Sequence, residues 1–138
     1  SVSPWTSKEN YTTAREMGQL LDNIYSGKKF GAAASTDMLE VMKRVKYHDR
    51  LPRYLPSGWS IAHKTGLLRK ACHDAGIVYS PSGNYIISVL TSNVPDYRSA
   101  KKFISKIAAI SFRYFKTPSS SLATASGIRP STTFDPAS

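Results

Sequence analysis

Apolar residues recur at helical spacing near the start of the chain. The repeat opens with Thr13-Ala14-Arg15-Glu16, a spacing at which a threonine and a glutamate can satisfy each other's free backbone amides. Its apolar positions are Ala14, Met17, Leu20, Leu21 and Ile24. The pattern therefore predicts an amphipathic helix that begins after Thr13 and ends at Gly27.

A second helical repeat follows after a short link. It begins near Ser35 or Thr36 and places Asp37 in its first turn, where the helix dipole favours a negative charge. Its apolar positions are Met38, Leu39, Met42 and Val45. Pro52 and Pro56 mark the loop that we expect after this helix.

The pattern changes at Trp59 from helical spacing to short runs of β-prone residues. Three such runs cover residues 59–65, 75–79 and 85–91. The last two are separated by Ser80-Pro81-Ser82-Gly83-Asn84, whose residue types are typical of a turn. We therefore expect three antiparallel strands that follow one another in the sequence.

A long helical repeat occupies residues 97–115. The residues predicted on its packed side are Phe103, Ile104, Ile107, Ala108, Ser111, Tyr114 and Phe115, and those predicted outside it are Arg98, Lys101, Lys102 and Lys106. This helix should pack on the sheet. The expected fold class is α/β, of the α+β type, with an antiparallel sheet of about three strands flanked by N-terminal and C-terminal helices.

The composition shifts after Lys116. Ten of the 22 residues in 117–138 are serine or threonine and three are proline, which leaves too few apolar residues to offset the entropy of ordering. Over the whole chain 41% of the residues are hydrophobic, enough to build a core. We expect one folded region in residues 1–116 and a disordered tail in residues 117–138.

The chain is strongly basic. Nineteen lysine and arginine residues stand against nine aspartate and glutamate residues, a net charge of +10, which favours an anionic partner. The basic residues form small scattered groups, and no zinc spacing, aromatic RNA-binding run or clear helix-turn-helix pattern accompanies them. A solvated basic surface is therefore favoured over a nucleic-acid site. The chain also shows no signal-peptide pattern and no apolar run long enough to cross a membrane, so we expect it to be soluble.

Cysteine and histidine usage gives little sign of a metal or redox centre. Cys72 is the single cysteine, which excludes an internal disulfide and favours a small core residue. Three histidines without a spaced set of carboxylates do not predict a metal site, and no cofactor is expected.

Four segments occur in a fixed order along the chain. They are Asn10-Tyr11-Thr12-Thr13-Ala14-Arg15-Glu16-Met17, Leu55-Pro56-Ser57-Gly58-Trp59, His63-Lys64-Thr65-Gly66, and a strand led by His73-Asp74. From about residue 10 to residue 115, this series is similar to the C-terminal part of class A β-lactamases and the related penicillin-recognising serine hydrolases. A Lys-Thr-Gly triplet alone is a weak signal, but the ordered series at compatible spacings is much more specific.

The resemblance implies roles for the strand that carries the triplet. Lys64 and Thr65 offer a positive charge and a hydroxyl donor, which can hold a substrate carboxylate by charge-assisted hydrogen bonds. Gly66 leaves room for a ligand to approach the backbone. The backbone amide of Leu67 is expected to be a catalytic donor in the oxyanion hole, where losing one donor costs on the order of 3 kcal/mol.

Three neighbouring residues are candidates for supporting the site. The resemblance places His63 and His73 beside it, and for both a packed or hydrogen-bonded histidine is favoured over a catalytic one. Asp74 is expected to make a structural hydrogen bond or ion pair near the strand.

The family's nucleophile motif is not recognisable in this sequence. Family chemistry needs Ser-x-x-Lys, a Ser-Asp-Asn-type motif and, in β-lactamases, a loop glutamate, all of which normally precede the first helix seen here. Ser26-Gly27-Lys28-Lys29, Ser99-Ala100-Lys101-Lys102 and Ser82-Gly83-Asn84 match these spacings, but their places at a helix end, a helix start and a turn favour chance matches. We expect this chain alone to have little or no hydrolase activity.

Two functions from different classes remain open. In the first, the chain is the C-terminal segment of a serine β-lactamase-like hydrolase of the cell envelope or the secreted fraction. Its substrate is then a β-lactam or a peptidoglycan-like peptide, and its partner is the missing N-terminal helical part of the same enzyme. In the second, it is a non-catalytic interaction module of the same fold that uses Lys101, Lys102 and Lys106 to hold an anionic partner or a membrane surface. A fragment, one chain of a split enzyme and a product that has lost catalysis are all compatible with the sequence.

Overall fold

The structure, a computed structural model, describes residues 11–116. The first ten residues and the expected tail at 117–138 lie outside the described residues. No helix in the described range is long and apolar enough to cross a membrane.

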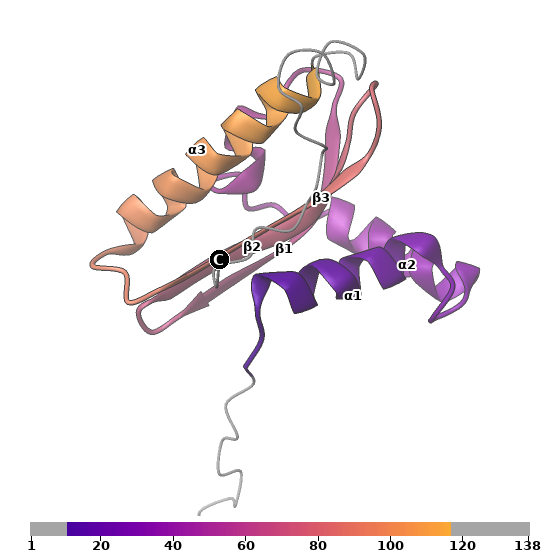
Figure 1. The fold of residues 1–138 in the computed structure, drawn as a ribbon, viewed down its shortest axis with the longest axis horizontal. Helices are drawn as coiled ribbons and strands as arrows, with labels where there is room; N and C mark the ends of the chain where they lie inside the picture. The colour runs from indigo at the N-terminus through magenta and orange to yellow at the C-terminus, as the bar shows by residue number, and fades with distance from the viewer. Residues whose placement is uncertain (1–10, 117–138) are drawn as a thin grey trace, which may run out of the picture.

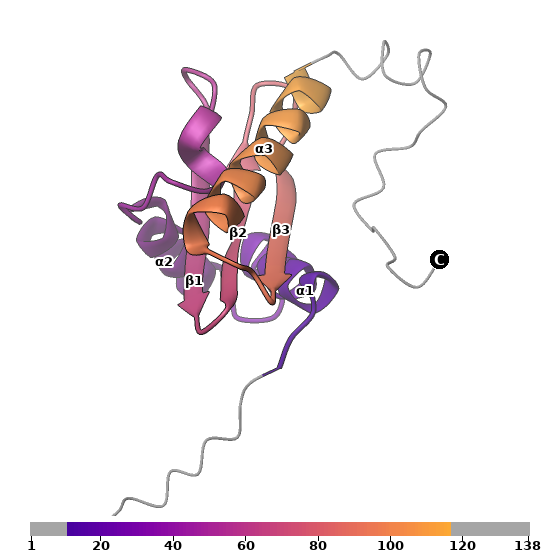
Figure 2. The ribbon, with the colours of Figure 1, turned by 90° about the vertical axis from the view of Figure 1, so that its left-hand side faces the viewer.

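The fold is a three-stranded antiparallel sheet with helices on both faces. Strands β1 (Ser60–Leu68), β2 (Ala71–Tyr79) and β3 (Tyr85–Ser92) are hydrogen-bonded in the order β1-β2-β3. Helices α1 (Ala14–Ser26) and α2 (Ala32–Lys43) cover one face, and α3 (Tyr97–Lys116) covers the other together with the short 3-10 helix η1 (Leu51–Tyr54) (Figures 1 and 2). The predicted α+β class and strand order are confirmed.

Helix α1 has the predicted limits because both of its ends are encoded locally. The backbone amide of Glu16 donates to Oγ1 of Thr13 at 3.1 Å, and the amide of Thr13 donates back to Oε2 of Glu16 at 3.0 Å. Gly27 ends the helix with φ of 70°, a left-handed conformation that glycine adopts without steric cost.

The predicted start of α2 was wrong. The helix begins at Ala32, after Gly31 with φ of 85°, so Asp37 lies beyond the first turn. No side chain caps this end, and the amide of Ser35 donates to the carbonyl of Gly31 at 3.1 Å. Residues 32–34 are alanines, the strongest helix formers, which explains why the helix starts upstream of the serine and threonine that usually mark such a start.

Strands β1 and β2 are longer than predicted. They continue to Leu68 and from Ala71, which leaves a tight connection at Arg69 and Lys70, where Lys70 has φ of 59°. The sequence signal for this turn was weak because neither residue is glycine, proline or asparagine. As a consequence, Gly66 lies inside a paired strand, opposite His73 in the register.

Each face of the sheet has its own core. On the α1 and α2 side the buried members of the core cluster are Leu21, Ala75 and Ile77. On the α3 side they are Leu51, Ile61, Cys72, Val78, Tyr85, Ile87, Ala100, Ile104, Ala108 and Phe112. Cys72 is thus a buried core residue, as expected, and its burial raises the pKa of the thiol.

The packed side of α3 is rotated from the predicted one. Ala100, Ile104, Ala108 and Phe112 are buried at intervals of four residues, whereas Phe103 is 53% exposed. Phe103 was therefore wrongly placed on the packed side, because it lies about 100° around the helix from Ile104. Lys101 was wrongly placed outside, since its Nζ lies 2.8 Å from Oδ2 of Asp49 and its side chain is partly covered.

Candidate active site

The residues of the Lys-Thr-Gly triplet lie on β1, at the edge of the described sheet. Among residues 11–116, β1 pairs with β2 on one side and has no strand on its other side. Backbone groups on the open side of such a strand are free to meet a ligand. The edge therefore has the accessibility that a substrate-binding strand requires.

The side chains of this strand alternate between the two faces of the sheet. Ile61 belongs to the core under α3, so His63 and Thr65, at spacings of two, point to that same face. Lys64 and Gly66 point to the face of α1 and α2. Lys64 and Thr65, adjacent in sequence, thus present their functional groups from opposite faces of one edge.

The segment from His63 to Leu67 is buried at its start and exposed at its end. His63 is 1% exposed, Lys64 is exposed, and Leu67 is 47% exposed although it is apolar. Nζ of Lys64 donates to the carbonyl of Thr65. The segment therefore emerges from the core at Lys64 and stays open to solvent as far as the end of β1.

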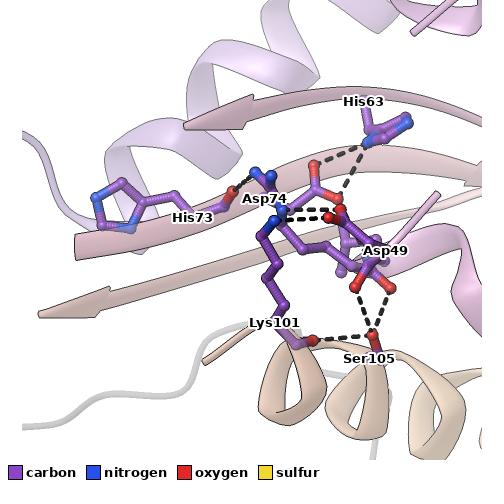
Figure 3. Close-up of polar contacts among 8 residues, drawn as sticks. Asp49, His63, His73, Asp74, Lys101 and Ser105 are labelled. Atoms are coloured by element: carbon purple, nitrogen blue, oxygen red, sulfur yellow. Dashed lines mark hydrogen bonds and ion pairs between the residues drawn. The ribbon is translucent and has the colours of Figure 1, made fainter. Parts of the chain in front are cut away.

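His63 is held by Asp74 from the neighbouring strand. Nδ1 of His63 lies 2.9 Å from Oδ1 and 3.0 Å from Oδ2 of Asp74, a fully buried residue (Figure 3). Oδ2 also accepts a hydrogen bond from the backbone amide of Leu51 at 3.1 Å. Because an ionised carboxylate only accepts, we assign the proton of the contact to Nδ1 of His63.

A buried polar cluster connects this pair to α3. Arg50 is 3% exposed and donates through Nη1 to the carbonyl of His73 at 3.3 Å and through Nε to Asp49 at 3.2 Å. Oγ of Ser105 lies within 3.1 Å of the carbonyls of Asp49, Arg50 and Lys101 (Figure 3). The loop before η1 is therefore fixed both to α3 and to β2.

Asp49 ion-pairs with both cations of this cluster. Its Oδ1 lies 3.2 Å from Nε of Arg50, and its Oδ2 lies 2.8 Å from Nζ of Lys101. Burial alone raises the pKa of Asp49, but the hydrogen bond from Lys101 and the charges of Arg50 and Lys101 outweigh it and hold the pKa below its ordinary value.

The pH dependence of the free energy of unfolding should reveal the ion pair of Asp49 with Lys101 when Lys101→Met is compared with the original chain. The folded state lowers the pKa of Asp49. The ion pair of Asp49 with Lys101 therefore stabilises the fold fully above about pH 4, the ordinary pKa of an aspartate, and this stabilisation is lost as the pH falls through the lower pKa that Asp49 has in the folded state. We expect a loss of roughly 0.5–1 kcal/mol near pH 7 that shrinks toward zero in acid, measured by urea unfolding across pH. Lys102→Met, at an exposed neighbour, is the control, and an equal loss in both variants would contradict the assignment.

His73 lies on the opposite face of the sheet from the cluster and contacts Gly66. A Cβ placed on Gly66 would lie 3.5 Å from Cδ2 of His73, so the ring packs against the glycine of the triplet. Nδ1 of His73 accepts a hydrogen bond from the amide of Thr91 at 3.1 Å, and burial lowers the pKa of the ring. These contacts favour a neutral ring with its proton on Nε2. Figure 3 shows this ring turned away from Asp74.

The serines with nucleophile-like spacing occupy ordinary structural positions. Ser26 ends α1 and donates to the carbonyl of Asn23, whereas the amide of Ser99, in the first turn of α3, donates to Asp96. Ser82 lies in the turn between β2 and β3 and donates to the carbonyl of Phe115. Their expected places at a helix end, a helix start and a turn are confirmed.

Sequence reasoning did not find Asp49, Arg50 and Ser105 as parts of the cluster. They lie on a loop and in the middle of a helix, and Ser105 is 55 residues from its acceptor in Arg50. The one local signal was charge in the loop, where His48-Asp49-Arg50 precedes Pro52.

Among residues 11–116, no three histidine, cysteine, aspartate or glutamate side chains form a group that could hold a metal ion.

Solved structures with the same fold are β-lactamases and a penicillin-binding protein. A β-lactamase from Sphaerobacter thermophilus is 24% identical, with a TM-score of 0.75, over 80% of this chain and 43% of the other. TLA-3 extended-spectrum β-lactamase is 27% identical, with a TM-score of 0.73, over 82% and 45%. PBP-A is 26% identical, with a TM-score of 0.66, over 76% and 40%. The chain thus spans less than half the length of each of these proteins.

Two further comparisons used the sequence of the chain. A search of curated proteins gave no match, whereas a family model did match. The model of the β-lactamase enzyme family matches residues 2–115, nearly the whole of the chain before the tail segment. Together with the sheet and helix order of the solved structures, this match shows that the chain belongs to the β-lactamase enzyme family.

Proposed function

We propose that this chain forms one wall of the acyl-transfer pocket of a serine β-lactamase-like hydrolase. The observation that carries the proposal is the solvent-accessible run from Lys64 to Leu67 on the open edge of β1, in which Lys64 and Leu67 are exposed and Thr65 and Gly66 are partly covered. In this role Lys64 and Thr65 hold the substrate carboxylate, Gly66 admits the substrate to the backbone, and the amide of Leu67 stabilises the oxyanion.

The residues of this strand edge and the relatives both support a substrate class for the proposed function. A cation and a hydroxyl on one strand edge suit a carboxylate, which β-lactams and the ends of cell-wall peptides both carry. A mutant of PBP-A has been solved as an acyl-enzyme complex with penicillin G. By extension from such relatives, we assign this chain a β-lactam or peptidoglycan-like substrate. Its place in the cell envelope or outside the cell stays a prediction from the sequence resemblance.

The nucleophile of the proposed reaction comes from residues outside this chain. Ser26, Ser82 and Ser99 are engaged at helix ends or in a turn. The hydroxyl of Ser105 in the buried cluster lies within hydrogen-bonding distance of three backbone carbonyls. In this proposal the chain binds and polarises the substrate, while an upstream helical part forms the acyl-enzyme.

The test is acylation by a fluorescent penicillin, followed by intact mass spectrometry. We expect no adduct on the chain alone and an adduct on the upstream segment when the two are mixed. Lys64→Ala should slow acylation roughly tenfold to a hundredfold, because a charge-assisted hydrogen bond to the carboxylate is lost. The control is Lys102→Ala, an exposed lysine of α3 whose loss should leave acylation unchanged.

Each other outcome points elsewhere. An adduct on the chain alone would show that it carries its own nucleophile. No adduct in either sample would favour a non-catalytic module of the same fold, and salt-sensitive binding of anionic vesicles or nucleic acid that survives Lys64→Ala would support that module directly.

A further inference from the structure

We propose that His63 is a positioning residue that sets the orientation of the Lys64–Leu67 edge through its contact with Asp74. This inference rests on the function proposed above, since it concerns how that edge is held. It assigns no chemical step to His63, which is buried and faces the interior.

The need for such a residue follows from the place of β1 in the sheet. An edge strand has hydrogen-bonded backbone on one side only, so it is held less firmly than a central strand. Beyond His63 the strand also leaves the core, because Lys64 and Leu67 are exposed and Thr65 and Gly66 are only partly covered. Ordinary packing therefore holds the first half of β1 well and the second half poorly.

His63 is the last buried residue before the exposed edge. Its ring bridges to β2 through both oxygens of Asp74, which lies opposite Thr65 in the strand register. Because side chains alternate along a strand, fixing the ring of His63 on the α3 face also fixes Lys64 on the other face and Thr65 back on the α3 face. This buried contact thus supports the register in which Lys64 and Thr65 lie on their respective faces.

Asp74 is itself held in place, which makes it a firm anchor. It accepts from the amide of Leu51, at the start of η1, while Arg50 next to Leu51 donates to the carbonyl of His73. Ser105 joins the Arg50 carbonyl to α3. Contacts with β2, η1 and α3 therefore help to hold the orientation of the Lys64–Leu67 edge, in addition to the backbone of β1 itself.

Space at the contact is limited as well. A Cβ placed on Gly76, opposite His63 in the register, would lie 2.7 Å from Cβ of His63 and 2.6 Å from the Ala62 carbonyl. Glycine at this position lets β1 and β2 approach closely enough for the His63 ring to reach Asp74.

The test compares His63→Asn with His63→Val. An asparagine amide nitrogen branches from the side chain at about the position of Nδ1, so it can still donate to Asp74, whereas valine has no donor. Backbone amide hydrogen exchange at residues 64–68 should become about tenfold faster in His63→Val and change less than about threefold in His63→Asn, after correction for global stability. Ile87→Ala removes buried side chain from the same core on β3 and serves as the control for a general loss of stability.

A second measurement connects the contact to the proposed clamp. Benzylpenicillin is titrated into each variant of the chain, and its dissociation constant is read from the amide shifts of residues 64–68. We expect His63→Val to weaken binding about tenfold and His63→Asn to restore it to within about threefold of the original chain.

The two measurements fail in different ways. If benzylpenicillin does not bind the original chain, the proposed clamp fails, and hydrogen exchange still decides whether His63 holds the edge. If His63→Val leaves exchange at residues 64–68 unchanged, or changes it no more than Ile87→Ala does at equal stability, His63 is not a positioning residue.

Discussion

Phe112→Ala is expected to lower the free energy of unfolding by about 4 kcal/mol, the largest change that we predict for a single side chain. Phe112 is 3% exposed at the centre of the core between α3 and the sheet. Its ring meets Trp59 edge to face, with ring centres 5.9 Å apart, a contact that adds to the effect of burial. Removing the ring leaves a cavity that α3 cannot close without moving along the sheet.

The matched control is Phe103→Ala on the same helix. Phe103 is 53% exposed, so its loss should cost less than about 1 kcal/mol. Urea unfolding followed by tryptophan fluorescence would measure both variants. A larger loss in Phe103→Ala than in Phe112→Ala would show that α3 is rotated from its place in the structure with Phe103 toward the sheet, since the two residues lie about 180° apart around the helix, and equal losses would contradict the difference in their burial.

This pair of phenylalanines also shows what the sequence could and could not predict. The existence and length of α3 follow from its helical repeat, which local chemistry sets. Its rotation does not, because apolar residues lie on more than one side of the helix and the sheet decides which of them are buried. For the same reason Ser105 could not be assigned to the interior, although it is fully buried against the loop before η1.

The helix starts show a similar division. The start of α1 was predictable because Thr13 and Glu16 act on each other over three residues. The start of α2 was not, because Gly31 ends the preceding turn and no capping side chain marks the place. The reciprocal pair of Thr13 and Glu16 was therefore a reliable signal, whereas Ser35, Thr36 and Asp37 suggested a cap that the alanines at 32–34 made unnecessary.

The motif of the candidate site could be recognised in the sequence, and His63 and Asp74 were named there as candidates for supporting it, but their contact with each other was not predicted. The run His63-Lys64-Thr65-Gly66 was identified from the order of motifs, and its roles in binding and catalysis remain predictions. The contact of His63 with Asp74 spans 11 residues across a hairpin, and that of Asp74 with Leu51 spans 23. Such contacts depend on strand register and on the packing of η1, which no local pattern encodes.

Gly76→Ala is expected to cost about 3 kcal/mol and to separate β1 from β2 at the candidate site. An added Cβ would lie 2.6 Å from the Ala62 carbonyl oxygen and 2.7 Å from Cβ of His63. The carbonyl belongs to the backbone of β1, so it cannot rotate away as the end of a flexible side chain could. Gly76 has no positive φ, so alanine is acceptable to the backbone itself and the cost is steric.

Gly66→Ala provides the comparison within the same pair of strands. There the new Cβ would lie 3.5 Å from Cδ2 of His73, an ordinary contact, so we expect a change in stability of less than about 1 kcal/mol. Urea unfolding measures both variants, and the ring nitrogen shifts of His63 report whether its contact with Asp74 survives. If Gly76→Ala were as stable as Gly66→Ala with unchanged shifts of His63, β1 and β2 would have room that the structure does not show, and the close fit that directs His63 to Asp74 would be refuted.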